Sequence, residues 1–249
     1  MGLFVRDETY DETHRMTGFQ RYKQLLSFYA WHWIKLGFIT FLCAIPLMLG
    51  IAYAILSTSV VMALALGLVG GAILGPFIGA LVDNIYRAMR DDPGLRWDNY
   101  KKGLRQNAKD SILPGAILGL FISIYAFILY LAIYTDSVIM TKGTAALLIA
   151  AFFIFTVFSN LFWPQLVLFR QPITQTVRNI LLFTAKYFWK VLKVSLLELL
   201  FVGFHVIFAP YTMILLPFLS IWYYIFFSQF QLYDSLNEEL KIEEKSNLQ

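Results

Sequence analysis

Six long apolar stretches dominate the pattern of hydrophobic and polar positions along the chain. They cover residues 36–56, 60–82, 112–134, 145–169, 191–208 and 211–230. A helix needs about 20 apolar residues to cross the hydrocarbon core of a bilayer. Lipid offers no water to backbone amides, so continuous apolar runs of this length are expected to be helices. The pattern predicts an all-α, polytopic bundle with about six transmembrane helices.

The polar stretches divide the chain into three parts. Residues 1–35 are a cytoplasmic N-terminal segment with an amphipathic lead-in, 36–230 are the membrane domain, and 231–249 are an acidic cytoplasmic tail. From Asp234 onward this tail is expected to be a solvated, fraying helix end. No connection is long enough to hold a separate soluble core. The last two spans are joined tightly at Ala209-Pro210, so a re-entrant pair is an alternative to two full crossings.

Basic residues alternate from one connection to the next. The cytoplasmic connections, about 83–111 and 170–190, carry seven and four of them, whereas connections 57–59, 135–143 and 209–210 carry only Lys142. By the positive-inside rule the basic face is cytoplasmic, and both termini lie there. The first 30 residues contain no apolar segment, so a cleavable signal peptide is not expected. The basic residues of the two connections are Arg87, Arg90, Arg96, Lys101, Lys102, Arg105 and Lys109, then Arg170, Arg178, Lys186 and Lys190.

Composition supports the membrane assignment. The chain is 59% hydrophobic and 14% charged, whereas soluble domains carry about 25% charged residues. The net charge of +4 lies beside apolar spans, so we expect contact with anionic lipid and none with nucleic acid. Cys43 is the single cysteine and permits neither an intrachain disulfide nor a metal cluster.

Catalytic motifs are missing from the sequence. It contains no Walker A loop, H-E-x-x-H pair, cysteine cluster or G-x-S-x-G elbow, so we predict no cofactor, no metal and no catalytic residues. An intramembrane enzyme with scattered catalytic residues is the weaker alternative.

Three cytoplasmic stretches that lead into outgoing spans share a pattern of apolar positions. They begin near Tyr22, Tyr100 and Val177, about 78 and 77 residues apart. This spacing suggests three helical hairpins, each preceded by a cytoplasmic amphipathic helix. The alternative is that any amphipathic helices entering a membrane share apolar residues at fourfold spacing.

Glycine recurs every fourth residue in the second span, at Gly67, Gly71, Gly75 and Gly79. A stripe of this kind allows another helix to approach closely, which favours association in lipid. The partner is a helix of the same chain or a second copy in a homo-oligomer, and we favour the internal contact.

Glu198 and His205 are ionisable residues within the predicted fifth span. Seven residues of helix place them on nearly the same face. Such groups are costly in a membrane and suggest a proton or ion path. Asn160, Gln165 and Gln229 are candidate partners. The alternative is a protonated Glu198 hydrogen-bonded between helices, with His205 near the outer headgroups.

Residues 97–110 predict an amphipathic helix on the cytoplasmic surface, where basic side chains would bind anionic lipid or a protein partner. The basic residues of this surface are Arg96, Lys101, Lys102, Arg105 and Lys109.

A family resemblance is carried by residues 75–115. The motifs are Gly75-Pro76-Phe77, Asp83, Arg87-Ala88-Met89-Arg90-Asp91-Asp92-Pro93-Gly94, Trp97, Tyr100 and Gln106-Asn107-Ala108-Lys109-Asp110-Ser111-Ile112-Leu113-Pro114-Gly115. This stretch resembles the YesL-like (DUF624) family of bacterial integral membrane proteins.

The resemblance implies a multi-pass plasma-membrane protein of unassigned biochemistry, in a family often associated with carbohydrate uptake, and it supplies no catalytic residues. We therefore expect a non-enzymatic membrane protein, an accessory to carbohydrate transport or to cell-envelope physiology. The alternative is a small transporter or channel that uses Glu198.

Overall fold

The computed structural model describes residues 16–92, 96–134, 141–169, 171–212 and 214–243, and every regular element in these ranges is a helix. This confirms the prediction of an all-α bundle for the described residues. The elements are α1 (Gly18–Leu56), α2 (Val60–Met89), α3 (Arg96–Tyr134), α4 (Lys142–Phe169), α5 (Ile173–Lys186), α6 (Phe188–Ile207), α7 (Ala209–Thr212), the π-helix η2 (Leu216–Ser220) and α8 (Ile221–Leu240).

Four of these helices, α1 to α4, are long and apolar enough to cross a membrane. They contain 39, 30, 39 and 28 residues, and only 28% to 33% of the most apolar part of each is buried within the protein. A helix that spans a bilayer turns apolar side chains outward because its solvent is lipid. The length and surface of these helices therefore agree with a membrane protein.

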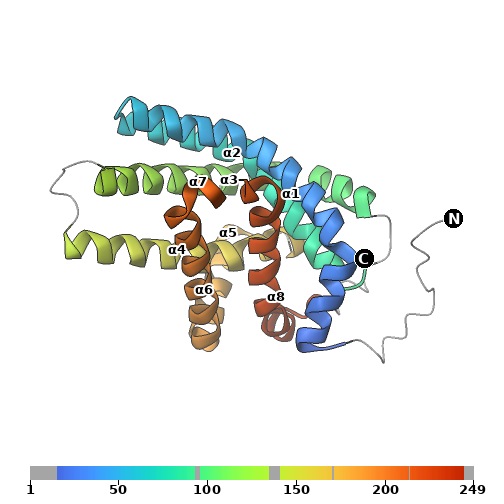
Figure 1. The fold of residues 1–249 in the computed structure, drawn as a ribbon. Coiled ribbons are helices and arrows are strands. Elements are labelled where there is room, and N and C mark those ends of the chain that lie inside the picture. Colours follow the sequence, from blue (N-terminus) through green and yellow to red (C-terminus); the bar gives the residue numbers. More distant parts are fainter. Residues whose placement is uncertain (1–15, 93–95, 135–140, 170, 213, 244–249) are drawn as a thin grey trace.

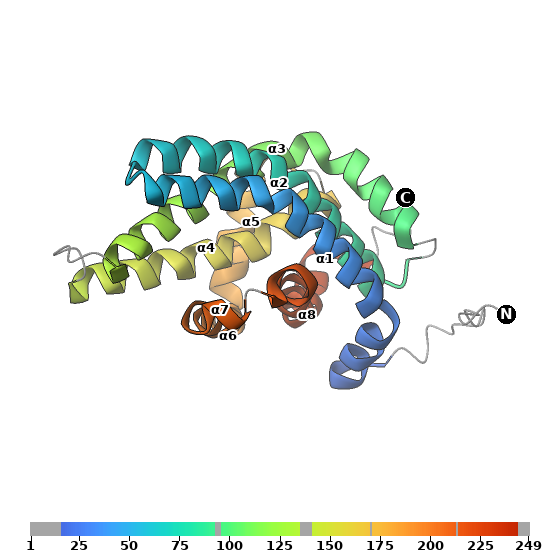
Figure 2. The ribbon, with the colours of Figure 1, turned by 45° about the horizontal axis from the view of Figure 1, so that its top comes forward.

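The last two predicted spans are built differently, and the count of six spans is not confirmed. Helix α6 carries Lys190, Lys193 and Glu198, and the stretch 211–230 is divided among α7, η2 and α8. In Figure 1, α6 and α8 run across α3 and α4 rather than beside them. In Figure 2 the same two helices are seen nearly end-on while α3 and α4 are seen from the side. They form a transverse C-terminal pair against the four long helices.

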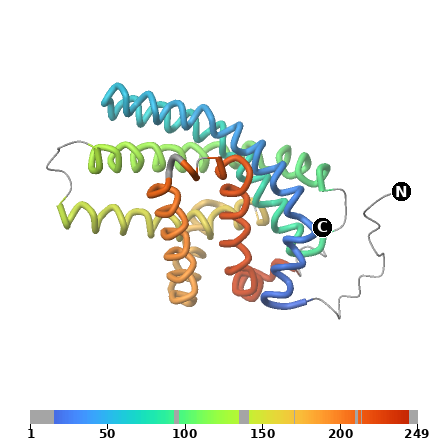
Figure 3. The backbone as a smooth tube through the Cα atoms, viewed as in Figure 1, coloured from blue at the N-terminus to red at the C-terminus, as the bar shows by residue number. Residues whose placement is uncertain are grey.

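The four long helices are stacked on one another. Figure 3 shows α1 and α2 running side by side as a hairpin, with α3 beneath them and α4 beneath α3. The main hydrophobic core lies where α1, α2, α4 and α8 meet. Its largest buried side chains include Trp33, Tyr86 and Phe226. The rings of Trp33 and Phe226 pack with centroids 4.6 Å apart, which fixes α8 on α1.

The amphipathic segments that precede the three predicted hairpins differ in whether they are continuous with the helix that follows. Helices α1 and α3 run without a break from the amphipathic segment into the apolar stretch, whereas α5 ends at Lys186 and α6 begins at Phe188. Tyr187 between them has a φ of −110° and a ψ of 33°, which are not helical values. The third unit therefore has a joint where the first two have none, and the threefold repeat stays a prediction.

The acidic tail does not begin at residue 231 as a separate segment. Helix α8 continues through Leu240 and ends at Lys241, which has a left-handed φ of 51°. The side chain of Ile242 is only 1% exposed, whereas Asp234, Glu238 and Glu239 are exposed, and a fraying end from Asp234 onward stays a prediction. Residues 244–249 lie outside the described residues, as do residues 1–15 and Arg170.

Candidate functional site

A cluster of buried polar side chains connects α4, α6 and α8. Glu198 of α6 is 1% exposed, and the amide Nδ2 of Asn160 in α4 donates a 2.7 Å hydrogen bond to its Oε1. The hydroxyl of Ser228 in α8 donates to the same oxygen. Asn160 therefore joins Glu198 as expected from the sequence, and Ser228 is an additional partner.

Two further bonds extend the cluster to α2. Gln229 Nε2 donates to the backbone oxygen of Asn160 over 3.1 Å, and the hydroxyl of Tyr86 donates to Gln229 Oε1 over 2.8 Å. Tyr86 and Gln229 are 0% and 2% exposed. We call Glu198, Asn160, Ser228, Gln229 and Tyr86 the polar cluster; it links four helices at the point where the transverse pair crosses the long ones.

The carboxyl group of Glu198 has two unequal oxygens. Oε1 accepts both hydrogen bonds, while the buried Oε2 accepts none of standard geometry from the described residues. The phenol of Tyr224 also interacts with the carboxyl group. These partners are uncharged, and a buried carboxyl is tolerated best when it is hydrogen-bonded or able to take up a proton. The arrangement is suited to holding a proton on Oε2.

His205 lies apart from this cluster. Its Nδ1 is 2.9 Å from the carbonyl oxygen of Phe201, so Nδ1 carries a hydrogen, and its Nε2 is 2.8 Å from the hydroxyl of Ser220. Seven helical residues correspond to about 10 Å along the axis. The structure therefore separates His205 from Glu198 and uses it to join α6 to η2. Gln165 likewise pairs with Asn179, over 3.1 Å, instead of with Glu198.

The glycine stripe of α2 packs against α3 of the same chain. A Cβ atom added to Gly71 would lie 2.2 Å from the carbonyl oxygen of Gly115, closer than real contacts allow. The backbones of α2 and α3 are therefore in direct contact, the geometry that small residues permit in membranes. We call this contact the glycine seam. It pairs Gly67, Gly71, Gly75 and Gly79 with Ser111, Gly115, Gly119 and Ser123.

The first turns of α3 present a basic surface. Tyr100, Gly103 and Asn107 are buried on one side of the helix. The exposed side carries Lys101, Lys102, Arg105 and Lys109, which we call the α3 basic surface. A shallow depression of about 360 Å³ lies among the first three of these side chains, Asp98 and Gln106. Arg96 differs from them, because its guanidinium lies 4.5 Å from the ring centre of Tyr29.

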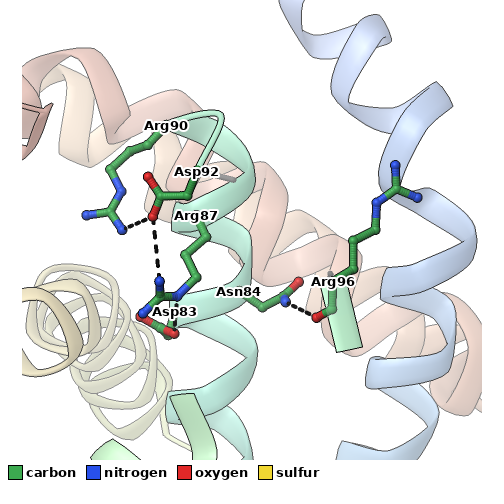
Figure 4. Close-up of polar contacts among 6 residues, drawn as sticks. All are labelled: Asp83, Asn84, Arg87, Arg90, Asp92 and Arg96. Atoms are coloured by element: carbon green, nitrogen blue, oxygen red, sulfur yellow. Dashed lines mark hydrogen bonds and ion pairs between the residues drawn. The ribbon is translucent and has the colours of Figure 1, made fainter. Parts of the chain in front are cut away.

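Ion pairs lie at the C-terminal end of α2 (Figure 4). Arg87 Nε lies 2.8 Å from Asp83 Oδ2, and Arg90 Nη2 lies 2.6 Å from Asp92 Oδ2. Asn84 Nδ2 donates to the backbone oxygen of Arg96 over 3.2 Å, which attaches the start of α3 to α2. Arg87 and Arg90 are thus paired with carboxylates that are largely buried. The α3 basic surface is exposed, and there Lys101 Nζ lies 2.8 Å from Asp98 Oδ1.

A further ion pair joins α1 to the turn that follows α2. Arg21, whose side chain is 7% exposed, lies 2.5 Å from Asp91 Oδ2 and also donates to the carbonyl oxygen of Met89 over 3.3 Å. Asp91 has a left-handed φ of 59°. A charged hydrogen bond from a buried arginine helps to hold a non-glycine residue in this uncommon conformation.

No family model, curated protein or solved structure matches the chain. Within the part of the chain that the structure describes, no group of three or more His, Cys, Asp and Glu side chains is placed to hold a metal ion. The two features that bear on function are therefore the α3 basic surface and the polar cluster.

Proposed function

We propose that the protein is a non-enzymatic, multi-pass protein of the bacterial plasma membrane that acts through its α3 basic surface, by contact with anionic lipid or a protein partner. The observation that carries the proposal is the exposure of Lys101, Lys102, Arg105 and Lys109 on one side of a helix whose other side is buried. Each basic residue near an anionic leaflet contributes about 1 kcal/mol of attraction.

The rigid attachment of this surface favours a binding role. Asn84 holds the first residue of α3, and a Cβ added to Gly103 would lie 2.5 Å from Asp83 Oδ2. The basic side chains therefore project from a fixed helix, so that little backbone order is lost on binding. The resemblance to the YesL-like family adds the narrower proposal of an accessory role in carbohydrate transport or cell-envelope physiology.

Lipid enrichment tests the proposal. The full chain is extracted in a mild detergent, and the ratio of anionic to zwitterionic phospholipid that copurifies is measured for the natural protein and for Lys101→Gln/Lys102→Gln/Arg105→Gln. We expect the anionic enrichment to fall about tenfold or more in the triple variant, while Lys142→Gln, on the opposite side in the proposed topology, leaves it unchanged. Equal enrichment in all three proteins, together with a stable monomer that retains no partner, would remove the proposal.

The proposed topology has cytoplasmic termini and either six spans or four spans with a re-entrant C-terminal pair. Both have an even number of crossings, so the position of the termini does not distinguish them. Tyr211 is 83% exposed between α6 and α8. In a Cys43→Ala background, Tyr211→Cys is labelled from outside intact cells by an impermeant maleimide if α6 and α8 span the membrane, and it is protected if the pair is re-entrant.

The polar cluster supports a second candidate function, a small transporter or channel that carries protons. The observation in its favour is the buried Glu198 Oε2, which accepts no hydrogen bond of standard geometry. Proteoliposomes with an imposed membrane potential and an internal pH-sensitive dye measure proton flux directly. We expect flux in the natural protein and its loss in Glu198→Gln, which keeps the Oε1 acceptor but cannot titrate. Equal flux in the two proteins would exclude Glu198 from such a path.

A further inference from the structure

The joint between α5 and α6 gathers hydrogen-bond donors onto the end of α8. Lys186 Nζ and the hydroxyl of Tyr187 both donate to Glu239 Oε1, and the Tyr187 hydroxyl is also 2.9 Å from Glu238 Oε2. Lys190 Nζ donates to Ser235 Oγ over 2.7 Å. We call Lys186, Tyr187 and Lys190 the α5–α6 corner. It is a set of two cations and a phenol directed at acceptors from a helix about 50 residues further along the chain.

The contact between the corner and the end of α8 shifts the pKa values of Lys186, Tyr187 and Glu239. The hydrogen bond from Lys186 lowers the pKa of Glu239, and the same bond raises the pKa of Lys186. Partial desolvation and the hydrogen bonds with Glu239 and Glu238 raise the pKa of Tyr187 to about 12. At neutral pH Lys186 and Tyr187 are therefore protonated and Glu239 is ionised. The contact is nevertheless open to water, because the side chains of Lys186 and Glu239 are 56% and 33% exposed.

Exposed apolar side chains lie within a few residues of the corner in the sequence. Leu181 and Leu182 of α5 are 57% and 60% exposed, and Trp189 at the start of α6 is 78% exposed. Exposed leucine and tryptophan beside lysine are the composition of a helix that lies in the interface between headgroups and acyl chains. The donors of the corner are therefore at the level of lipid phosphates if these apolar side chains enter the bilayer.

We propose that the α5–α6 corner is a binding site for the phosphate of an anionic bilayer lipid, and that Glu238 and Glu239 occupy this site in the structure described here. A phosphodiester offers a negative charge and several acceptor oxygens, which match the donors of Lys186, Tyr187 and Lys190. The two carboxylates supply the same chemistry from within the chain. The lipid and the end of α8 thus compete for one set of donors. The site is separate from the α3 basic surface and does not depend on the function proposed for it.

Native mass spectrometry of the full chain in a neutral detergent tests the competition. The probes are short-chain phosphatidylglycerol, short-chain phosphatidylcholine and inorganic phosphate. We expect Glu238→Gln/Glu239→Gln to raise the apparent affinity for phosphatidylglycerol about fivefold, because exposed ion pairs are weak enough to be displaced. Addition of Lys186→Gln and Lys190→Gln to that variant should abolish the gain. Phosphatidylcholine binding should not change.

Glu239→Gln alone removes one negative charge, and its matched control is Asp234→Asn, which removes one charge from an exposed position of α8 that has no hydrogen bond or ion pair to the corner among the described residues. An equal gain in this variant would assign the effect to net charge and overturn the proposal. An unchanged affinity for phosphatidylglycerol in Glu238→Gln/Glu239→Gln would also overturn the proposal, provided that the thermal unfolding midpoint of this variant matches that of the natural protein.

Inorganic phosphate distinguishes a lipid site from a site for free phosphate. If millimolar inorganic phosphate competes as effectively as the lipid, the site binds free phosphate and the proposed lipid site is wrong. Variants of the α3 basic surface should leave the gain intact, which separates this proposal from the preceding one.

Discussion

The glycine seam between α2 and α3 and the polar cluster around Glu198 hold helices together in opposite ways. In the seam, Gly71 and Gly115 bring two backbones into contact with no side chain between them. In the cluster, Glu198 and Asn160 join two helices through a 2.7 Å hydrogen bond between side chains. Hydrophobic burial does not drive helix association in lipid, so close packing and hydrogen bonding are the available means. The seam suits helices that run side by side, and the cluster suits helices that cross.

The two regions also differ in how their energy is distributed. The seam involves eight small residues along two helices, so its stabilisation comes from many weak contacts. The cluster depends on a few bonds at one crossing point, and a single bond, from Tyr86 to Gln229, connects α2 with α8. Substitutions should therefore damage the seam through steric overlap and the cluster through loss of partners.

The largest effect is expected in the seam. Gly71→Ala places a Cβ atom 2.2 Å from the carbonyl oxygen of Gly115, and the backbones of α2 and α3 must separate. We expect a loss of about 3 kcal/mol of stability, at the upper end of the usual cost of overpacking, measured by thermal unfolding in detergent.

Gly203→Ala in α6 is the control for this prediction. No atom lies within 4 Å of a Cβ added at Gly203, so this variant should be as stable as the natural protein or more stable by up to about 1 kcal/mol, from helix propensity. Similar behaviour of the two alanine variants would show that α2 and α3 are not in backbone contact.

The next largest effect is expected in the polar cluster. Glu198→Leu leaves the buried amide of Asn160 without its acceptor, and an unpaired buried donor costs about 1 to 3 kcal/mol. Glu198→Gln keeps an oxygen for Asn160 and Ser228, so its loss should be the smaller of the two. Unfolding by detergent titration measures both variants. A leucine variant that is at least as stable as the glutamine variant would mean that the cluster does not hold α4 to α6.

A smaller effect is expected at the link between the two regions. Tyr86→Phe removes one hydroxyl and leaves Gln229 Oε1 without a donor, at a cost of about 1 to 2 kcal/mol. Because the ring remains, its packing against Tyr233, with ring centroids 5.9 Å apart, should not change. Hydrogen exchange of α8 should increase in this variant while that of α3 stays constant. Equal changes in both helices would contradict the description of this bond as a local link.

The smallest effect concerns the end of α8 and depends on pH. Lys186 lowers the pKa of Glu239, so the stabilisation from this pair is fully present above the pKa of Glu239 in the unfolded chain and is lost as the pH falls through its lowered value. Exchange of the amides of residues 238–240, taken relative to their intrinsic exchange rate at the same pH, should therefore rise in acid, below about pH 4. In Glu239→Gln that acid-dependent rise should be absent. A rise of the same size in the variant would assign it to other groups.

Much of the fold follows from the sequence because its strongest patterns are long apolar runs. These runs report whether a segment is surrounded by lipid or by water. Apolar runs of 18 or more residues predict α1 to α4, and glycine at every fourth residue of α2 indicates a close helix contact. The glycine stripe alone does not identify the helix that packs against it. That helix is α3, where small residues form a complementary stripe at Ser111, Gly115, Gly119 and Ser123. A fourfold repeat of small residues in two successive spans is the signal that would have found it.

The site was harder to predict because its members come from four helices. Asn160 was a correct partner for Glu198, since polar residues in lipid seek one another. His205 was grouped with them on helical spacing alone, and the nearby hydroxyl of Ser220 takes its Nε2 instead. Ser228 and Tyr86 gave little signal, as serine and tyrosine are common in apolar helices. The direction in which α6 and α8 cross the long helices could not be predicted, because hydropathy reports burial in lipid and not the orientation of a helix.

Helix α3 is continuous from its basic first turns to the end of the glycine seam, and Pro114 lies inside it. A proline removes one backbone hydrogen bond of a helix and favours a bend there. Because the backbones of α2 and α3 touch at Gly71 and Gly115, a tilt of the basic end that extends past Pro114 must displace α2 as well. The connection between α5 and α6 differs, because Tyr187 interrupts the helix between them.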